Sequence, residues 1–116
     1  MLTFSELTYV RPDLNVLETS MHAAIARLRE ATDEDTANNA ISEINTLRNQ
    51  FETASQLVEI RHTIDTRDGF YETEQGFFDE AGPVYQGYVS SYYQTLTTHP
   101  LRSSLESTWG KQLFLL

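Results

Sequence analysis

Apolar residues at helical spacing dominate the first third of the chain. Between residues 13 and 31 they recur in steps of three and four, which places them on one face of an α-helix. These residues are Leu14, Leu17, Met21, Ala24, Leu28 and Ala31. Val16 and Ile25 widen the stripe. The pattern predicts a first helix over about residues 13 to 31.

The next stretch carries a heptad pattern, the seven-residue repeat with which helices pack against one another. Two sets of positions repeat in this way, the second set three positions after the first. They are Ala37, Ile44, Phe51 and Val58, and then Ala40, Leu47, Ala54 and Arg61. A second helix is therefore expected over about residues 34 to 64. Thr32 and Asp35 resemble a capping box at its start, and the short turn before it forces an antiparallel hairpin.

A third helix is rich in aromatic residues. The preceding pattern breaks between residues 64 and 69, where Asp65, Thr66 and Asp68 offer side-chain oxygens that cap a following helix. Aromatic residues then recur at helical spacing, and four of them lie seven apart on one face: Tyr71, Phe78, Tyr85 and Tyr92. Such a stripe either stacks on a ligand or lies in the core. We favour the core, with each hydroxyl reaching water or a polar partner.

Two prolines punctuate the second half of the chain. Gly82-Pro83 falls inside the third helix, which must kink there or stop and restart, because a proline within a helix costs roughly 3 kcal/mol. His99-Pro100 repeats the signal, and apolar residues at helical spacing then begin a fourth helix. They are Leu101, Leu105, Trp109 and Leu113. Only the stretch from Leu7 to Val10 is β-like, and it is short.

These patterns together predict an all-α fold. We expect one domain, residues 1–116, in which long antiparallel helical hairpins form a small bundle-like lobe. The expected helix N-caps are Asp13, Thr32 and Asp65, each contributing about 1 kcal/mol. The apolar run 113–116 has no glycine cap and no polar tail. We expect such an end to pack on other polypeptide or to be a cut in a longer sequence, and we favour the cut.

The composition excludes several classes of function. The 116 residues include 8 basic and 17 acidic side chains, a net charge of -9, so binding to nucleic acid or to an anionic membrane is disfavoured. No apolar run approaches the ~20 residues that span a bilayer, and the N-terminus lacks the features of a signal peptide. Since the sequence has no cysteine, it has neither disulfides nor thiolate metal sites. We expect a cytoplasmic protein.

The polar residues offer few candidates for metal binding or catalysis. The histidines are His22, His62 and His99, and none is paired one turn apart as in a His-Glu-x-x-His zinc helix. The closest approach to a metal site is Glu59-x-x-His62 with Asp65 and Asp68 beyond it. A di-iron helical enzyme would rest on Glu59 and His62 alone, so we favour a surface or interhelical polar cluster.

A second group of acidic residues is a candidate for general acid-base catalysis. It consists of Glu72, Glu74, Asp79 and Glu80. Paired carboxylates could perform general acid-base work, but their neighbours at helical spacing are aromatic core candidates, so we favour a solvated face. We therefore assign no catalytic or metal-ligating residue, and the substrate-binding residues are not identified.

An ordered series of motifs carries a family resemblance. It opens with Leu7-Thr8-Tyr9-Val10-Arg11-Pro12-Asp13 and continues with residues 43–52 and with Ile60-Arg61-His62-Thr63-Ile64-Asp65-Thr66-Arg67-Asp68-Gly69-Phe70-Tyr71. Residues 74–83 and 109–114 follow in the same order. In this series the chain resembles the N-terminal region of the oligoendopeptidase F-type metallopeptidases, family M3.

The resemblance implies a function for a longer protein. Members of the family are mostly helical and cleave short peptides with a zinc ion, held by His-Glu-x-x-His and a more distant glutamate. Those ligands do not occur in this sequence, so no catalytic or zinc-binding residue carries over. We expect a helical lobe, inactive alone, that shapes or covers the substrate channel. Its partner is then the remainder of the peptidase, and the substrates of the parent enzyme are oligopeptides.

The alternative is a self-sufficient acidic module for protein interaction. Its heptad seam would dock a partner helix, and exposed apolar surface would support a dimer. A reading frame that continues to a His-Glu-x-x-His motif favours the peptidase lobe. A stop codon after Leu116 favours the module.

Overall fold

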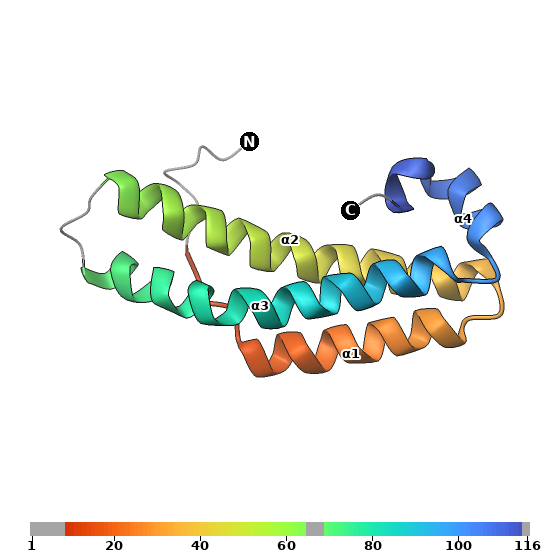
Figure 1. Cartoon of the computed structure of the whole chain (residues 1–116), viewed down its shortest axis with the longest axis horizontal. Helices are drawn as coiled ribbons and strands as arrows, with labels where there is room; N and C mark the ends of the chain where they lie inside the picture. The colour runs from red at the N-terminus through yellow and green to blue at the C-terminus, as the bar shows by residue number, and fades with distance from the viewer. Residues whose placement is uncertain (1–8, 65–68, 115–116) are drawn as a thin grey trace.

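Helices form the whole of the regular structure that the computed structural model describes, residues 9–64 and 69–114. Helix α1 spans Leu14–Glu30, α2 Glu34–Ile64, α3 Gly69–Thr97 and α4 Arg102–Trp109, and a 3-10 helix, η2, spans Lys111–Phe114. These described ranges contain no strand. Figure 1 shows α1, α2 and α3 running alternately in opposite directions. The predicted all-α class and the antiparallel hairpins are confirmed.

Helix length determines how the three long helices cover one another. α1 has 17 residues, whereas α2 has 31 and α3 has 29. At 1.5 Å per residue, α1 is about 25 Å long and the other two are about 45 Å long. α1 packs against both α2 and α3, but one end of the α2–α3 hairpin extends well beyond it (Figure 1).

The apolar stripes of the long helices meet in one core. Its buried members include Leu17, Met21, Ala24, Ile25 and Leu28 of α1, Ala37, Ala40, Ile41, Ile44, Phe51, Ala54 and Val58 of α2, and Phe78, Ala81, Tyr85, Val89, Tyr92 and Leu96 of α3. Phe51 stacks on Tyr85 at 4.2 Å between ring centroids and meets Phe78 edge-on at 5.3 Å. The predicted stripes are confirmed except at Val16, which is 58% exposed because it lies to the side of the face that meets α2 and α3.

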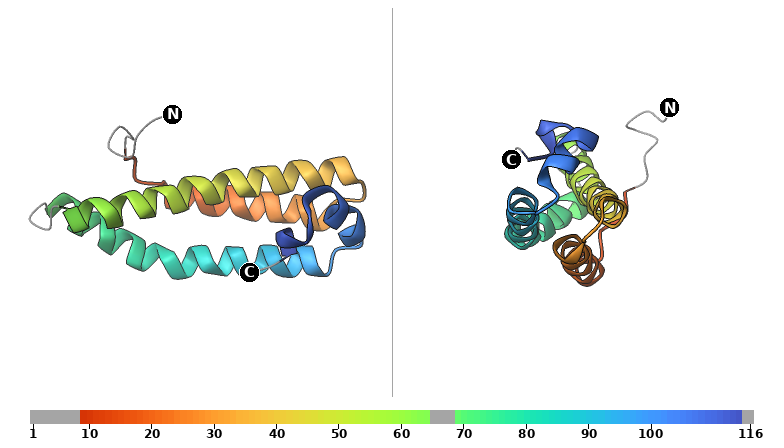
Figure 2. Two further views of the ribbon diagram at one scale, coloured as in Figure 1. Left: turned by 90° about the horizontal axis from the view of Figure 1, so that it is seen from above. Right: turned by 90° about the vertical axis from the view of Figure 1, so that its right-hand side faces the viewer.

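Pro83 does not end α3. The helix continues from Gly69 to Thr97 with Pro83 inside it, so the stop-and-restart alternative is wrong. Figure 2 shows α3 changing direction in its middle part, as expected of the kink. Pro83 and Asp79, whose carbonyl would accept the missing hydrogen bond, are both exposed. Water can therefore solvate that carbonyl, which makes the interruption tolerable.

The helix caps differ from prediction at one position. Asp13 caps α1 as expected, accepting a hydrogen bond from the Val16 N–H at 3.2 Å. At α2 the prediction that Thr32 is the N-cap is wrong. Asp33 instead accepts from the N–H of Thr36 at 2.8 Å and from its hydroxyl at 2.9 Å. The cap is one residue later than predicted because α2 begins at Glu34, which makes Asp33 the residue directly before the first helical position. The third expected cap, Asp65, lies outside the described residues.

The C-terminal part of the chain turns back on the bundle. α4 ends at Trp109 and does not continue to Leu113 as predicted, because Gly110 follows with φ 87° and donates its N–H to Glu106 at 2.8 Å. Gly110 thus caps α4 before the apolar run 113–116, which the sequence pattern places in the same helix. Beyond it Phe114 is buried, and the guanidinium of Arg102 lies 5.0 Å from the centre of its ring. Leu115 and Leu116 lie outside the described residues.

Two remaining expectations concern strands and membranes. Tyr9 and Val10, the described half of the β-like stretch, are irregular, while Leu7 and Thr8 lie outside the described residues. Among the helices that the structure describes, none is both long and apolar enough to cross a bilayer.

The shifted cap is testable by substitution. Asp33→Ala removes two hydrogen bonds at the start of α2 and should lower the melting temperature by several degrees, whereas Thr32→Ala should leave it unchanged. The hydrogen bonds from Thr36 lower the pKa of Asp33, so its contribution is complete above the ordinary aspartate pKa of about 3.9 and is lost as the pH falls through the folded pKa. Thermal unfolding followed by circular dichroism at pH 7 and at acid pH measures both effects. A larger effect of Thr32→Ala would restore the original assignment.

Candidate functional site

The four acidic residues of α3 lie in two kinds of environment, exposed and buried. Glu72, Asp79 and Glu80 are exposed, in agreement with the solvated face that the sequence predicts. Glu74 is only 4% exposed, so that prediction is wrong for this residue. It lies three residues after Tyr71 and four before Phe78, which is the spacing of the buried stripe. This spacing could have predicted from the sequence that Glu74 is buried and paired, because a carboxylate on a buried face requires a partner.

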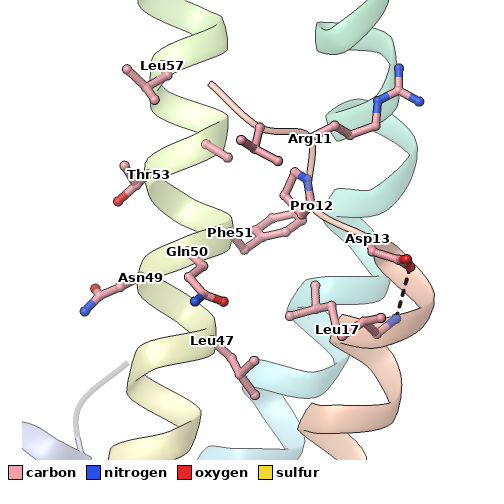
Figure 3. A pocket seen from close by; sticks show the side chains of 13 residues that line it. Arg11, Pro12, Asp13, Leu17, Leu47, Asn49, Gln50, Phe51, Thr53 and Leu57 are labelled. Carbon is pink, nitrogen blue, oxygen red and sulfur yellow. Dashed lines mark hydrogen bonds between the residues drawn. The ribbon is translucent and has the colours of Figure 1, made fainter. Parts of the chain in front are cut away.

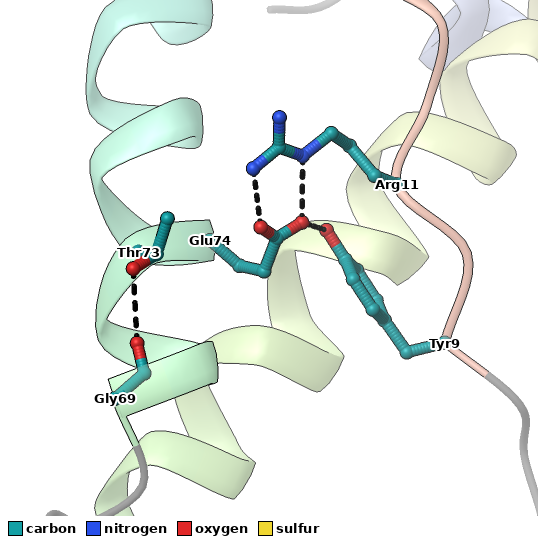
Figure 4. A network of polar contacts seen from close by, with 5 residues as sticks. All are labelled: Tyr9, Arg11, Gly69, Thr73 and Glu74. Carbon is teal, nitrogen blue, oxygen red and sulfur yellow. Dashed lines mark hydrogen bonds and ion pairs between the residues drawn. The ribbon is translucent and has the colours of Figure 1, made fainter.

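Glu74 is held by two side chains from the segment that precedes α1. Arg11 donates from Nε to Oε1 at 2.7 Å and from a terminal nitrogen to Oε2, which makes a two-pronged ion pair. The Tyr9 hydroxyl donates to Oε1 at 2.7 Å. Figure 4 shows the three side chains converging between the segment and α3. Both carboxylate oxygens thus have charged or phenolic donors.

The electrostatics of this cluster favour the ionised form of the Glu74 carboxylate. Hydrogen bonds from Arg11 lower the pKa of Glu74 more than burial raises it. The carboxylate in turn raises the pKa of Arg11, and burial together with the carboxylate raises the pKa of Tyr9. A proton donor or acceptor in general acid-base catalysis needs a pKa near the working pH and an open lone pair. Glu74 is therefore a structural anchor.

Aromatic packing supports the same anchor. The Arg11 guanidinium lies 4.7 Å from the centre of the Phe77 ring. The Tyr9 ring meets Phe70 at 6.0 Å and Tyr71 at 6.3 Å, both edge-on. The anchor therefore fixes the extended segment 9–13 against the start of α3.

A groove borders the anchored segment. It has a volume of about 710 Å³ and lies between segment 10–13, the start of α1 and the middle of α2. Leu47, Phe51 and Leu57 of α2 are among its lining residues, and Figure 3 shows Phe51 projecting from α2 toward Pro12. This groove could not be predicted from the residue pattern, because it depends on where the irregular segment crosses the helices.

The aromatic stripe of α3 belongs mainly to the core. Tyr85 and Tyr92 are buried, and neither hydroxyl makes a well-formed hydrogen bond within the described structure. The Tyr85 hydroxyl lies beside Arg48 and Glu52, so the expectation of a polar partner is wrong only for Tyr92. Burial raises the pKa of Tyr85 to about 12 and raises that of Tyr92 further. The Tyr93 hydroxyl accepts from Arg48 at 3.4 Å, and Arg48 lies 3.8 Å from Glu52. Arg48 thus links Tyr93 of α3 to Glu52 of α2 in a partly exposed polar cluster.

The histidines do not assemble a metal site. Nδ1 of His99 accepts from the Leu101 N–H at 3.0 Å, so Nε2 carries the proton and donates to the Leu28 carbonyl at 2.6 Å. Both ring nitrogens are thus occupied. His22 is exposed on α1 and His62 is partly buried on α2. No cluster of three or more potential metal-ligating side chains occurs in the described ranges, so the described residues do not fit a zinc site. Asp65 and Asp68, invoked with Glu59 and His62, lie outside those ranges.

Comparison with known proteins identifies the family. The family model of the peptidase M3 N-terminal domain matches residues 4–116. The chain therefore belongs to the M3 peptidase family, as its N-terminal domain, which confirms the resemblance seen in the sequence. Peptidases of this family are generally metallopeptidases. No curated protein matches the sequence significantly.

Solved structures agree with this assignment. A chain described as PZ peptidase A with an inhibitor is 48% identical, with a TM-score of 0.91 over 97% of this chain. An oligoendopeptidase F is 46% identical over 98%, and one from Bacillus anthracis str. Ames is 40% identical over 98%, both with TM-scores of 0.91. This chain spans only 20%, 20% and 21% of the respective chains.

The anchor at Glu74 predicts a charge-dependent stability. Glu74→Gln keeps the shape of the side chain but removes the charge that Arg11 neutralises, and should lower the free energy of unfolding by about 2 kcal/mol. Because the pKa of Glu74 is lowered, its contribution is complete above the ordinary glutamate pKa of about 4.3 and is lost as the pH falls through the folded pKa. Urea unfolding between pH 3 and pH 7 measures this. The exposed control Glu72→Gln should match the parent chain, and equal effects of the two substitutions would contradict the anchor.

His99 should behave as a structural residue. His99→Leu keeps much of the volume but leaves the partly buried Leu101 N–H without its acceptor, and should cost about 2 kcal/mol in urea unfolding. His22→Leu, on an exposed position of α1, serves as the matched control and should change stability little. A His99→Leu chain as stable as the parent would show that the two hydrogen bonds contribute nothing net.

Proposed function

We propose that this chain is the N-terminal lobe of an oligoendopeptidase F-like zinc metallopeptidase that hydrolyses oligopeptides. The single observation that carries the proposal is the combination of 48% identity and a TM-score of 0.91 with coverage of only 20% of the related chain. The family match, the sequence identity and the fold similarity therefore all relate this chain to one part of a longer peptidase. In this proposal the zinc is held by residues of the remaining polypeptide, and the lobe has no activity alone.

The chemistry of the described residues supports a scaffolding role. Glu74, the one buried carboxylate in the described ranges, is fully engaged by Arg11 and Tyr9. His99 has both ring nitrogens occupied. The other acids of α3 face solvent. These arrangements engage the buried acid and the buried imidazole of the described residues in contacts inside the lobe, as expected of a scaffold.

The shape of the lobe supports a place at the wall of a substrate channel. α2 and α3 form a long rigid hairpin, held along one half by α1 and at its other half by the anchored segment. A hairpin of this kind can form the wall of a channel without taking part in peptide hydrolysis. In the proposal it shapes or covers the channel in which the remainder of the peptidase hydrolyses oligopeptides.

A chimeric enzyme tests the proposal. Residues 1–116 replace the matched part of PZ peptidase A, and hydrolysis of fluorogenic oligopeptides is measured for the chimera and for the isolated chain. We expect the chimera to hydrolyse peptides and to lose activity with a chelator, whereas the isolated chain should be inactive with and without added zinc. Chelator-sensitive hydrolysis by the isolated chain, or a folded chimera without activity, would contradict the proposal.

A further inference from the structure

The groove beside segment 10–13 exists because α1 is shorter than its neighbours. α1 begins at Leu14, while α2 continues past it for several turns. The irregular segment 10–13 replaces a helix there and leaves one flank of α2 open (Figure 3). Leu47, Phe51 and Leu57 of α2 are among the residues that line that opening, and Phe51 and Leu57 are buried.

The rim of the groove is apolar and strongly exposed. Val10 is 72% exposed and Val16 is 58% exposed, and they are the two most exposed large apolar side chains in the described part of the chain. Both border the same groove. Val16 lies on a helix whose apolar stripe is otherwise buried. Exposed apolar surface gathered in one concavity is typical of an interaction site.

The charged residues at the groove are already engaged. Arg11 is paired with Glu74, and Asp13 accepts the hydrogen bond that caps α1. The other polar groups on the lining are the neutral side chains of Asn49, Gln50 and Thr53. The groove therefore presents an apolar surface with uncharged polar neighbours, which favours an occupant that is apolar and uncharged.

We propose that this groove docks an apolar, uncharged face of the peptidase polypeptide that lies outside residues 1–116. The inference rests on the proposed function. Its support is the length of that polypeptide, since about four fifths of each solved relative lies outside the matched part. A second copy of the chain is a poorer occupant, because each copy carries a net charge of -9 and two copies repel each other.

Site-specific labelling tests the docking, and the absence of cysteine makes it practicable. Val16→Cys is introduced into the isolated chain and into the chimera with PZ peptidase A, and labelling by a maleimide is followed by peptide mass spectrometry. We expect labelling at this position to be about tenfold slower or more in the chimera, because access of the reagent controls the rate. Val84→Cys, at an exposed apolar position of α3 away from the groove, is the matched control and should label at similar rates in both.

A second substitution gives an independent readout. Val16→Lys should leave the melting temperature of the isolated chain unchanged, because the side chain is exposed there, but should lower that of the chimera by several degrees. Equal labelling rates at position 16 in both proteins, together with an unchanged chimera melting temperature, would overturn the proposal. If labelling of position 16 in the isolated chain slows as the protein concentration rises, a second copy of the chain occupies the groove. That result would also overturn the proposal.

The outcomes separate this inference from the proposed function. A chimera that hydrolyses peptides but leaves position 16 reactive retains the function and rejects the docking. A folded chimera that is inactive but protects position 16 rejects the function and retains the docking.

Discussion

The ion pair between Arg11 and Glu74 is the interaction on which the arrangement of this lobe depends. α1 is too short to cover the whole α2–α3 hairpin, so the irregular segment before it must cover the rest. An irregular segment has few main-chain hydrogen bonds of its own, and a buried carboxylate with two donors supplies a specific point of attachment. The same attachment sets the wall of the apolar groove.

Aromatic packing holds the hairpin together between this anchor and the α1 contact. Phe51 of α2 stacks on Tyr85 and meets Phe78 edge-on, which ties the middle of the two helices over the region that α1 leaves uncovered. At the opposite end His99 connects the α3–α4 turn to the last turn of α1 through the Leu28 carbonyl. Polar anchors thus lie at the two ends of an apolar core.

Glu74 and His99, the buried acid and the buried imidazole of the described residues, have structural roles. In a metallopeptidase the ligands and the general base must keep open lone pairs directed at metal and substrate. Glu74 and His99 have theirs occupied by partners within the lobe. Neither side chain is therefore free to act as a metal ligand or as a general base in this structure.

The sequence by itself determined the helices, their stripes and the family, because helical periodicity and ordered motifs depend on residues close together in the chain. The burial of Phe51 and Tyr85 could be read from spacing alone. The tertiary structure decided the rest. Glu74 is buried because Arg11, 63 residues away, crosses over it. Asp33 caps α2, and Val16 stays exposed, because the turn and the packing angle of α1 set those positions. Spacing cannot specify a contact that depends on how helices cross, and that is why the anchor and the groove appeared only in the fold.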